Sequence, residues 1–362
     1  MIQSRGNLAF AFSTNYIMSA PKPVISNVFE SSASDRLARF ITEQGIASSD
    51  VIALTPDAST RNYFRIRWKK STAVAAVYPE PFDPEFHPYL DVTRLFLDCD
   101  IPVPEIYAVD GNAGIIVQED LGDRQLFHIY DESEELCDEY KEKAIALIAE
   151  IQKATAHAYE TQSIASRLAF DEAKLSWELD FFFDHYFGSL RGETLRHAEV
   201  AELKAELNDI AAELAAAPRV LCHRDYHASN LMIDNKKRLR VVDHQDARMG
   251  PASYDLVSFL LDRQPCPPSL AELRAYRLFF LEQRRLLGLS AIDPDDFALE
   301  FRLMTIQRGL KATGTFSYQT AVCNRGAVYQ HYIQPTLEIV LQAAEWLERF
   351  PTLRRMLKER IN

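Results

Sequence analysis

The chain has 362 residues, of which 47% are hydrophobic, and a formal net charge of −12 at pH 7. It is long enough to bury a large core, which chains of this size usually divide between two lobes or domains. The acidic balance argues against nucleic acid as the main partner, because phosphate backbones are bound by clustered lysine and arginine side chains.

The sequence also argues against a membrane or secreted protein. No uninterrupted apolar run approaches the length of a membrane span, so we expect no membrane partner. The first 20 residues hold one arginine and a short, broken apolar patch. This composition predicts a disordered tail over residues 1–27 instead of a signal peptide, with Met18 as an alternative start. The five cysteines are scattered without a CxxC pair, which is typical of a reducing compartment and predicts a cytoplasmic protein.

Regular structure is predicted first as a helix and then as strands. Residues 33–45 have helical spacing, with Leu37, Phe40 and Ile41 on one face. A second helix is predicted over residues 87–99, among five segments with strand-like patterns. These strands are expected at residues 51–54, 63–68, 72–78, 103–109 and 114–119.

Beyond residue 134 the pattern becomes helical. The periodicity predicts helices over residues 139–160, 172–187, 198–217, 270–287, 295–313 and 335–357. The sequence therefore predicts an α+β fold with two lobes. The smaller, mainly β lobe is expected over residues 28–120 and the larger, mainly α lobe over residues 121–362.

The most informative segment lies between two of these helices and reads Cys222-His223-Arg224-Asp225-Tyr226-His227-Ala228-Ser229-Asn230. After it, residues 231–233 and 239–243 form two short apolar runs around a polar turn, which predicts a β-hairpin. The second strand of an antiparallel hairpin returns beside the start of the first, so we expect Asn230 and Asp243 to meet at one end. An amide oxygen and a carboxylate in this arrangement suit a hard cation such as Mg²⁺.

Asp225 lies five residues before Asn230, close enough to face a phosphate bound by the same ion. Phosphoryl transfer requires metal ligands for a triphosphate and a carboxylate that orients the attacking hydroxyl and accepts its proton. One alternative is zinc, because His223 and His227 stand four residues apart, but the accompanying glutamate is missing and the flanks are strand-like. A purely structural pair of His223 and Asp225 is the other alternative, and it does not explain the kinase spacing of the whole set.

Two segments of the smaller lobe have the positions of nucleotide-binding elements in such an enzyme. Residues 55–62 are small and polar and link the first two strands, where a loop over the phosphates of ATP is expected. The candidate ligands there are Ser59, Thr60, Arg61 and Asn62. The linker has no glycine, and a plain hairpin turn is an equal alternative. Glu119 and Leu121 lie at the end of the fifth strand, at the position of a hinge whose backbone groups pair with adenine. An ordinary strand exit is the alternative.

These motifs resemble those of the aminoglycoside phosphotransferase and choline kinase superfamily, which shares the protein-kinase-like fold. The catalytic-loop pattern is His223-x-Asp225-x-His227-x-x-Asn230, and the metal-loop pattern runs from Val242-Asp243 to Tyr254-Asp255-Leu256. Within the superfamily, the chain looks most like the bacterial anomeric kinases of N-acetylmuramate and N-acetylglucosamine, which feed cell-wall recycling. This likeness is carried by residues 57–65, by Asp243-His244-Gln245-Asp246-Ala247 and by Gln307-Arg308-x-Leu310-Lys311-x-x-Gly314-x-Phe316.

The resemblance implies a role for each residue of the central motifs. Asp225 would be the catalytic base, and Asn230 and Asp243 would be the ligands of Mg²⁺. Asp255 would brace the catalytic loop, with His223 as a second structural residue.

One departure from the superfamily concerns the third strand. Ala73-Val74-Ala75-Ala76-Val77-Tyr78 lacks the usual lysine for the phosphates. The resembling sugar kinases are also lysine-poor there, so we expect Arg61 or Arg65 to supply the charge, because both fall on one face of the preceding strand. A nucleotide-binding pseudokinase is the alternative reading.

The acceptor is predicted from the later motif. Arg308 and Lys311 lie three residues apart and share a helix face, which by itself suits a solvated cationic face at least as well as a binding site. The resemblance implies that they are candidate ligands of the sugar. Further candidates are His227, Gln245 and Glu178. A kinase of choline or an aminoglycoside, the alternative, would need carboxylates or aromatic rings around the cation. The resemblance favours a kinase that phosphorylates the anomeric hydroxyl of N-acetylmuramate or N-acetylglucosamine.

Overall fold

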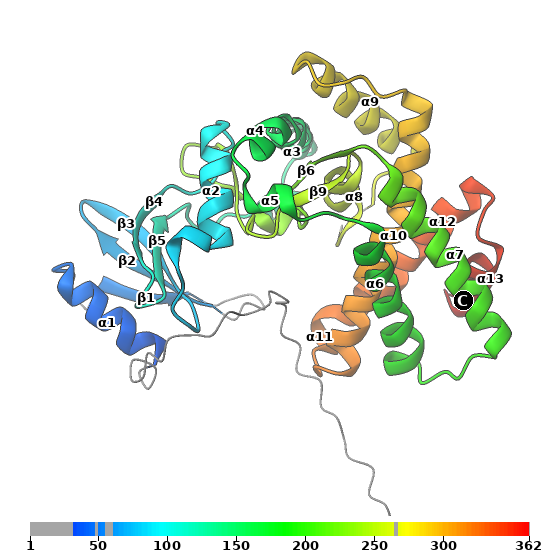
Figure 1. Ribbon diagram of the computed structural model, residues 1–362, viewed down its shortest axis with the longest axis horizontal. Coiled ribbons are helices and arrows are strands. Elements are labelled where there is room, and N and C mark those ends of the chain that lie inside the picture. Colours follow the sequence, from blue (N-terminus) through cyan, green and yellow to red (C-terminus); the bar gives the residue numbers. More distant parts are fainter. Residues whose placement is uncertain (1–31, 48–49, 55–60, 264–266, 362) are drawn as a thin grey trace, which may run out of the picture.

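The structure, a computed structural model, describes residues 32–47, 50–54, 61–263 and 267–361. The tail predicted for residues 1–27, and Ser59 and Thr60, lie outside these residues. The described chain forms a small sheet flanked by helices and a larger helical part (Figure 1). This is the two-lobed, protein-kinase-like α+β fold that the sequence predicted. The lobe boundary at residue 120 stays a prediction.

The sheet has five antiparallel strands in the order β1-β2-β3-β5-β4. Their bounds are Val51–Leu54 (β1), Asn62–Trp68 (β2), Ser71–Val77 (β3), Ile106–Asp110 (β4) and Ile115–Glu119 (β5). All five strands were predicted. β4 begins later than predicted, because Pro104 has no N–H to donate to the ladder.

Helices cover both faces of this sheet. α1 (Ala33–Glu43) buries the predicted face of Leu37, Phe40 and Ile41 in a cluster with side chains of β2, β3 and β5. α2 (Pro88–Asp98) stands between the sheet and the helical part (Figure 1). Its Tyr89 packs on Ile116, whose side chain points to the opposite face of β5 from its neighbours.

The larger part consists mainly of helices. Their bounds are Glu134–Lys153 (α3), Thr155–Glu160 (α4), Ile164–Arg167 (α5), Glu172–Phe182 (α6), His197–Ala216 (α7), Tyr254–Leu261 (α8), Leu270–Leu286 (α9), Pro294–Ala321 (α10), Gly326–Tyr329 (α11), Ile333–Leu347 (α12) and Pro351–Ile361 (α13). A π-helical segment, Phe183–Leu190, continues α6, and 3₁₀ segments lie at Pro84–Phe86, Leu126–Asp131, Ala228–Asn230 and Gln330–Tyr332. None of the described helices combines the length and the apolar character that crossing a membrane requires.

Two of the helix predictions are wrong, because the structure has two consecutive helices where the sequence predicted one. Residues 139–160 belong to α3 and α4, which meet at a turn at Ala154. Residues 335–357 belong to α12 and α13. There, Glu348 leaves helical geometry with a φ of 54°, and Pro351 starts the second helix.

α10 continues beyond its predicted end at residue 313 and contacts α6, α8 and α12. Gly314 permits the close approach of α6: a Cβ at this position would lie 2.7 Å from the Cα of Phe182. The helix predicted over residues 172–187 changes to π geometry at Phe183, directly beside this contact. The glycine therefore places the side chains of α6 next to those of α10.

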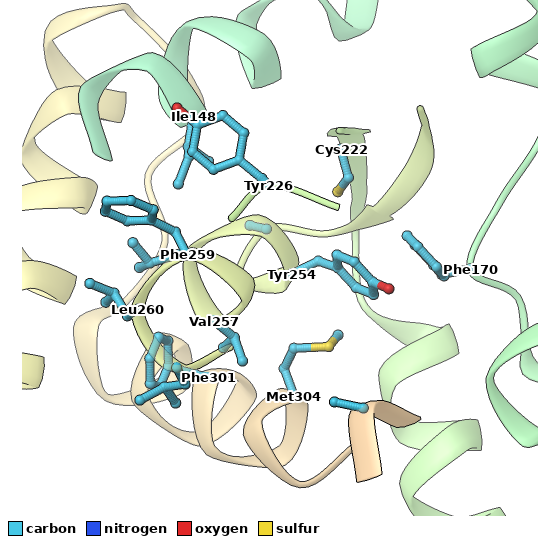
Figure 2. Close-up of a cluster of buried hydrophobic side chains, with 14 of the residues drawn as sticks. Ile148, Phe170, Cys222, Tyr226, Tyr254, Val257, Phe259, Leu260, Phe301 and Met304 are labelled. Atoms are coloured by element: carbon cyan, nitrogen blue, oxygen red, sulfur yellow. The ribbon is translucent and has the colours of Figure 1, made fainter. Parts of the chain in front are cut away.

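The hairpin predicted after Asn230 is confirmed. β7 (Leu231–Ile233) pairs with β8 (Leu239–Val241), with Leu231 opposite Val241. A second pair, β6 (Arg219–Cys222) and β9 (Arg248–Pro251), was not predicted, and neither was α8. Figure 2 shows the core around α8, where Tyr226 lies near Phe259, with ring centroids 6.0 Å apart. This core anchors the loop between β6 and β7.

Candidate active site

The loop that carries Asp225 is fixed by buried hydrogen bonds. The carboxylate of Asp255 in α8 accepts bonds from the N–H groups of His223 (2.6 Å) and Arg224 (3.0 Å). The His223 ring is fully buried and donates through Nε2 to the carbonyl of Val242 (3.0 Å). The loop is thus tied both to α8 and to the hairpin, while the Asp225 side chain stays 27% exposed.

The hairpin brings Asn230 and Asp243 to the same end, as predicted. The N–H of Val242 donates to the carbonyl of Asn230 across 3.0 Å, and Asp243 follows directly. Nδ2 of Asn230 donates to the carbonyl of Asp225 (2.9 Å), which leaves Oδ1 as an acceptor. Asp243 has a φ of 62°, which is strained for a residue other than glycine and is typical of functional sites.

An amide oxygen and a partly exposed carboxylate at one point fit a hard cation such as Mg²⁺. Within the described residues, no three histidine, cysteine, aspartate or glutamate side chains gather as a metal site of the kind that zinc uses. The oxygen pair of the hairpin is therefore the candidate for the cation.

Three cationic side chains surround the carboxylate of Asp225. Nζ of Lys311 lies 3.5 Å and Nη1 of Arg308 lies 4.0 Å from Oδ1, and Nε of Arg224 lies 3.7 Å from Oδ2. Burial by itself would raise the pKa of Asp225, but these charges hold it well below its ordinary value. The carboxylate is therefore ionised at neutral pH and able to accept a hydrogen bond from a hydroxyl.

Arg308 and Lys311 do not form a solvated face, which was one of the two readings of the sequence. Only 3% of Arg308 is exposed. Its guanidinium donates to the hydroxyls of Tyr254 (2.9 Å) and Ser258 (2.7 Å) and pairs with Asp262 at 3.1 Å. The protein thus holds Arg308 in place, and Lys311 has the shortest of the three distances to the carboxylate of Asp225.

His227 and Gln245, predicted to bind the acceptor, instead contact the hairpin end. Nε2 of Gln245 donates to Oδ1 of Asp243 (2.9 Å). The His227 ring contacts Arg263 and the amide of Asn230. Burial and then the charge of Arg263 lower the pKa of His227 to about 3, so the ring is neutral. Their acceptor-binding role stays a prediction.

Arg61 lies beside Asp243, on the side of the small sheet. Its Nη2 is 3.6 Å from Oδ1 of Asp243, and its guanidinium lies over the rings of Tyr78 and Tyr63, at 5.5 and 6.0 Å from their centroids. Burial would lower the pKa of Arg61, but Tyr63, Tyr78 and Asp243 together raise it. A stable positive charge therefore stands beside the candidate metal site.

Arg65 is engaged elsewhere. Its guanidinium is held by Asp120 and Asp123, each at 2.8 Å. The structure thus separates two arginines that the sequence left equivalent, and Arg61 is the one next to Asp243. Asn62 is exposed at the start of β2, opposite Val77.

The end of β5 and the residues after it connect the sheet with the helical part (Figure 1). The carboxylate of Glu119 pairs with Arg240 of β8 at 2.5 Å, and its N–H donates to the carbonyl of Glu105 (2.8 Å). Leu121 is buried, with 6% of its surface exposed. The pairing of their backbone groups with adenine stays a prediction.

Glu178 lies in a buried polar cluster between α6 and α10. Nε2 of Gln307 donates to its Oε2 (2.9 Å), and Nζ of Lys174 lies 3.6 Å from its Oε1. Neither Oε1 of Glu178 nor Oε1 of Gln307 has a hydrogen-bond partner among the described residues. Unsatisfied buried acceptors are rare, and these two make the cluster a candidate place for an additional hydrogen-bond donor.

Sequence reasoning missed three cations of this region. Arg224 and Arg248 both pair with Asp246, at 2.9 and 3.7 Å, and Lys174 pairs with Glu178. The spacing of Lys174, four residues before Glu178 on a predicted helix, was a signal that could have found it. No local signal pointed to Arg248, because it approaches the loop through the pairing of β9 with β6.

The fold and these residues together define the class of the protein. Residues 50–289 match the phosphotransferase enzyme family (APH), and the chain belongs to this family. It is therefore a phosphotransferase, a kinase of the type that uses an alcohol group as acceptor.

Curated relatives carry the name N-acetylmuramate/N-acetylglucosamine kinase. One from Pseudomonas aeruginosa is 29% identical over 286 residues, which cover 77% of this chain and 79% of the relative. One from Neisseria meningitidis serogroup B is 28% identical over 278 residues, which cover 74% of this chain and 78% of the relative. The chain is similar to these kinases over most of its length.

Solved structures support the fold alone. A choline kinase from Streptococcus pneumoniae superposes with a TM-score of 0.55 at 14% identity. The superposition covers 86% of this chain and 98% of the choline kinase chain. A spectinomycin phosphotransferase in complex with ADP and spectinomycin superposes with a TM-score of 0.56, with the same identity and coverage.

Proposed function

We propose that the protein is an ATP- and Mg²⁺-dependent kinase that phosphorylates the anomeric hydroxyl of N-acetylmuramate, N-acetylglucosamine or both. The observation that carries the proposal is the ionised Asp225 beside Lys311, on the loop that also places Asn230 next to Asp243. The name shared by the curated relatives supports the choice of acceptor.

Asp225 would accept a hydrogen bond from the attacking hydroxyl and take up its proton as the phosphoryl group is transferred. A carboxylate with a depressed pKa is a weak base, so its main contribution is to orient the hydroxyl before the proton moves. Lys311 would offset negative charge that develops between the hydroxyl and the phosphate.

The nucleotide would be held from both lobes. Asn230 and Asp243 would hold Mg²⁺, which would offset the negative charge of the triphosphate. Arg61 would contact the same phosphates from the sheet, because a guanidinium can bind two phosphate oxygens at once. In this way it would replace the lysine that β3 lacks.

A cationic alcohol such as choline or an aminoglycoside is disfavoured by the charges around Asp225. Lys311, Arg308 and Arg224 all lie within 4.0 Å of this carboxylate. They would repel a positively charged acceptor, which enzymes usually bind with carboxylates and aromatic faces.

Measurement of ADP release tests the proposal. We expect ATP turnover with N-acetylmuramate or N-acetylglucosamine, and none with choline or an aminoglycoside. The product should carry an anomeric phosphate, which phosphorus NMR distinguishes from a phosphate on a primary hydroxyl. Turnover with the cationic alcohols alone would contradict the sugar assignment, and no turnover with any acceptor would favour a nucleotide-binding pseudokinase.

The arginine assignment gives a second test. We expect Arg61→Ala to raise the KM for ATP at least ~10-fold, equivalent to about 1.4 kcal/mol, because it removes the charge beside Asp243. Arg65→Ala should move this KM less, since Asp120 and Asp123 already occupy its guanidinium. Steady-state kinetics with varied ATP and saturating sugar would measure both. A larger effect from Arg65→Ala, or no effect from the double variant, would mean that other groups hold the phosphates.

A further inference from the structure

Beyond Asp225, cations from three separate elements converge on the acceptor side of the site. Lys174 comes from the first turn of α6, Arg248 from β9 and Arg224 from the catalytic loop. Arg224 and Arg248 share the carboxylate of Asp246, while Lys174 pairs with Glu178, whose other oxygen accepts a hydrogen bond from Gln307, one turn before Lys311 on α10. The chain as a whole carries a net charge of −12, so a local gathering of cations is unexpected.

The carboxylates of this region do not balance the cations. Arg308 and Asp262 pair with each other and are not counted here. The remaining described side chains of the cluster are four cations and three carboxylates. The members are Lys174, Arg224, Arg248 and Lys311, with Asp225, Asp246 and Glu178. One positive charge therefore lacks a protein counter-charge.

The pKa shifts agree with this imbalance. Burial lowers the pKa of Lys174; Glu178 opposes the shift, while Arg224, Arg248 and Lys311 add to it. Burial also lowers the pKa of Arg248, and repulsion by Arg224 adds to that shift. An anion that arrived between these groups would relieve the repulsion.

Lys174 is the cation best placed to receive such an anion. Its side chain is 25% exposed, and its Nζ lies 4.1 Å from the centroid of the Trp177 ring, which is 51% exposed. An exposed ring beside a cation offers a flat apolar face for a sugar and a charge for its substituent. Lys311 and Arg308 lie against Asp225, where the phosphoryl group would be transferred, whereas Lys174 contacts a different carboxylate, that of Glu178.

We propose that Lys174, supported by Arg248, forms a subsite for a carboxylate group of the acceptor, so that the enzyme prefers an anionic amino sugar over its neutral counterpart. This inference rests on the proposed function and adds the basis of its selectivity. N-acetylmuramate carries a carboxylate on its lactyl ether, and N-acetylglucosamine has neither the ether nor the charge. The methyl ester of N-acetylmuramate keeps the shape of the acid and removes the charge.

The test compares these three acceptors in the full-length enzyme. We expect the wild-type kcat/KM to favour the acid over its methyl ester by at least ~10-fold, and Lys174→Met to reduce this preference below about threefold. Lys174→Arg should retain the preference, because it keeps the charge. The matched control is Lys204→Met: Lys204 of α7 pairs with Asp180 of α6 at 3.0 Å, away from the cluster, and its loss should leave the preference at the wild-type value.

Calorimetry in the presence of ADP and Mg²⁺ separates the subsite from the proposed function. If no acceptor is phosphorylated, the proposed function fails. The subsite is then still supported if the wild type binds the acid more tightly than the ester and Lys174→Met does not. The subsite would be overturned if the wild type showed the same kcat/KM and the same affinity for the acid and its ester. It would also be overturned if Lys174→Met kept the full preference for the acid, or if the wild type bound neither the acid nor the ester.

Discussion

Asp225→Asn should reduce kcat by about 10²- to 10⁴-fold, the range that a positioned acid–base group usually contributes. The amide keeps the shape of the side chain but no longer accepts the proton of the hydroxyl. The melting temperature should fall as well, because the substitution removes the carboxylate that offsets the charges of Lys311, Arg308 and Arg224 at 3.5 to 4.0 Å. Single-turnover kinetics and the melting temperature would measure the two effects separately.

The matched control is Asp138→Asn, which removes one carboxylate from an exposed ion pair with Lys141 on α3. Its kcat should equal that of the wild type. If Asp225→Asn retained more than a tenth of the wild-type kcat, the barrier would have risen by less than about 1.4 kcal/mol, and Asp225 would not be the base.

Asp243→Ala should weaken the binding of Mg²⁺ with ADP or ATP by at least ~10-fold, and more than Asn230→Ala does. The aspartate contributes a full negative charge to a dication, whereas the asparagine contributes only a dipole. The substitution also removes the negative charge that lies 3.6 Å from Arg61, so the positive charge of Arg61 would stand beside the cation without that offset. Titration of Mg²⁺ against activity, and calorimetry with Mg²⁺ and ADP, would measure the loss.

Asp138→Ala serves as the control for loss of one carboxylate, and its Mg²⁺ dependence should match that of the wild type. A Mg²⁺ requirement unchanged in Asp243→Ala would show that the cation is held elsewhere. An effect of Asn230→Ala larger than that of Asp243→Ala would instead make the amide the main ligand.

Local patterns were sufficient wherever neighbours in sequence remain neighbours in space. The hairpin of β7 and β8 is an example, because its pairing is set by two apolar runs and a short polar turn. The meeting of Asn230 and Asp243 followed from that pairing alone. The buried face of α1 followed in the same way from helical spacing.

Helix ends were predicted less well, because they depend on contacts with distant segments. α10 continues past residue 313 since Gly314 can face the backbone of Phe182 without a Cβ. The break at Glu348 has no strong local signal before Pro351, and the chain there adopts a left-handed conformation. Propensity is a weak guide where packing decides.

By itself, the sequence determined the two-lobed fold, the hairpin and the meeting of Asn230 with Asp243, and it predicted these two residues and Asp225 as the candidate catalytic set, because these patterns rest on short-range spacing. Only the tertiary structure distinguished Arg61 from Arg65, because Arg61 lies next to Asp243 whereas Arg65 pairs with Asp120. It also brought the cations of α6, β9 and the catalytic loop together, since side chains far apart in sequence meet only when the elements that carry them pack.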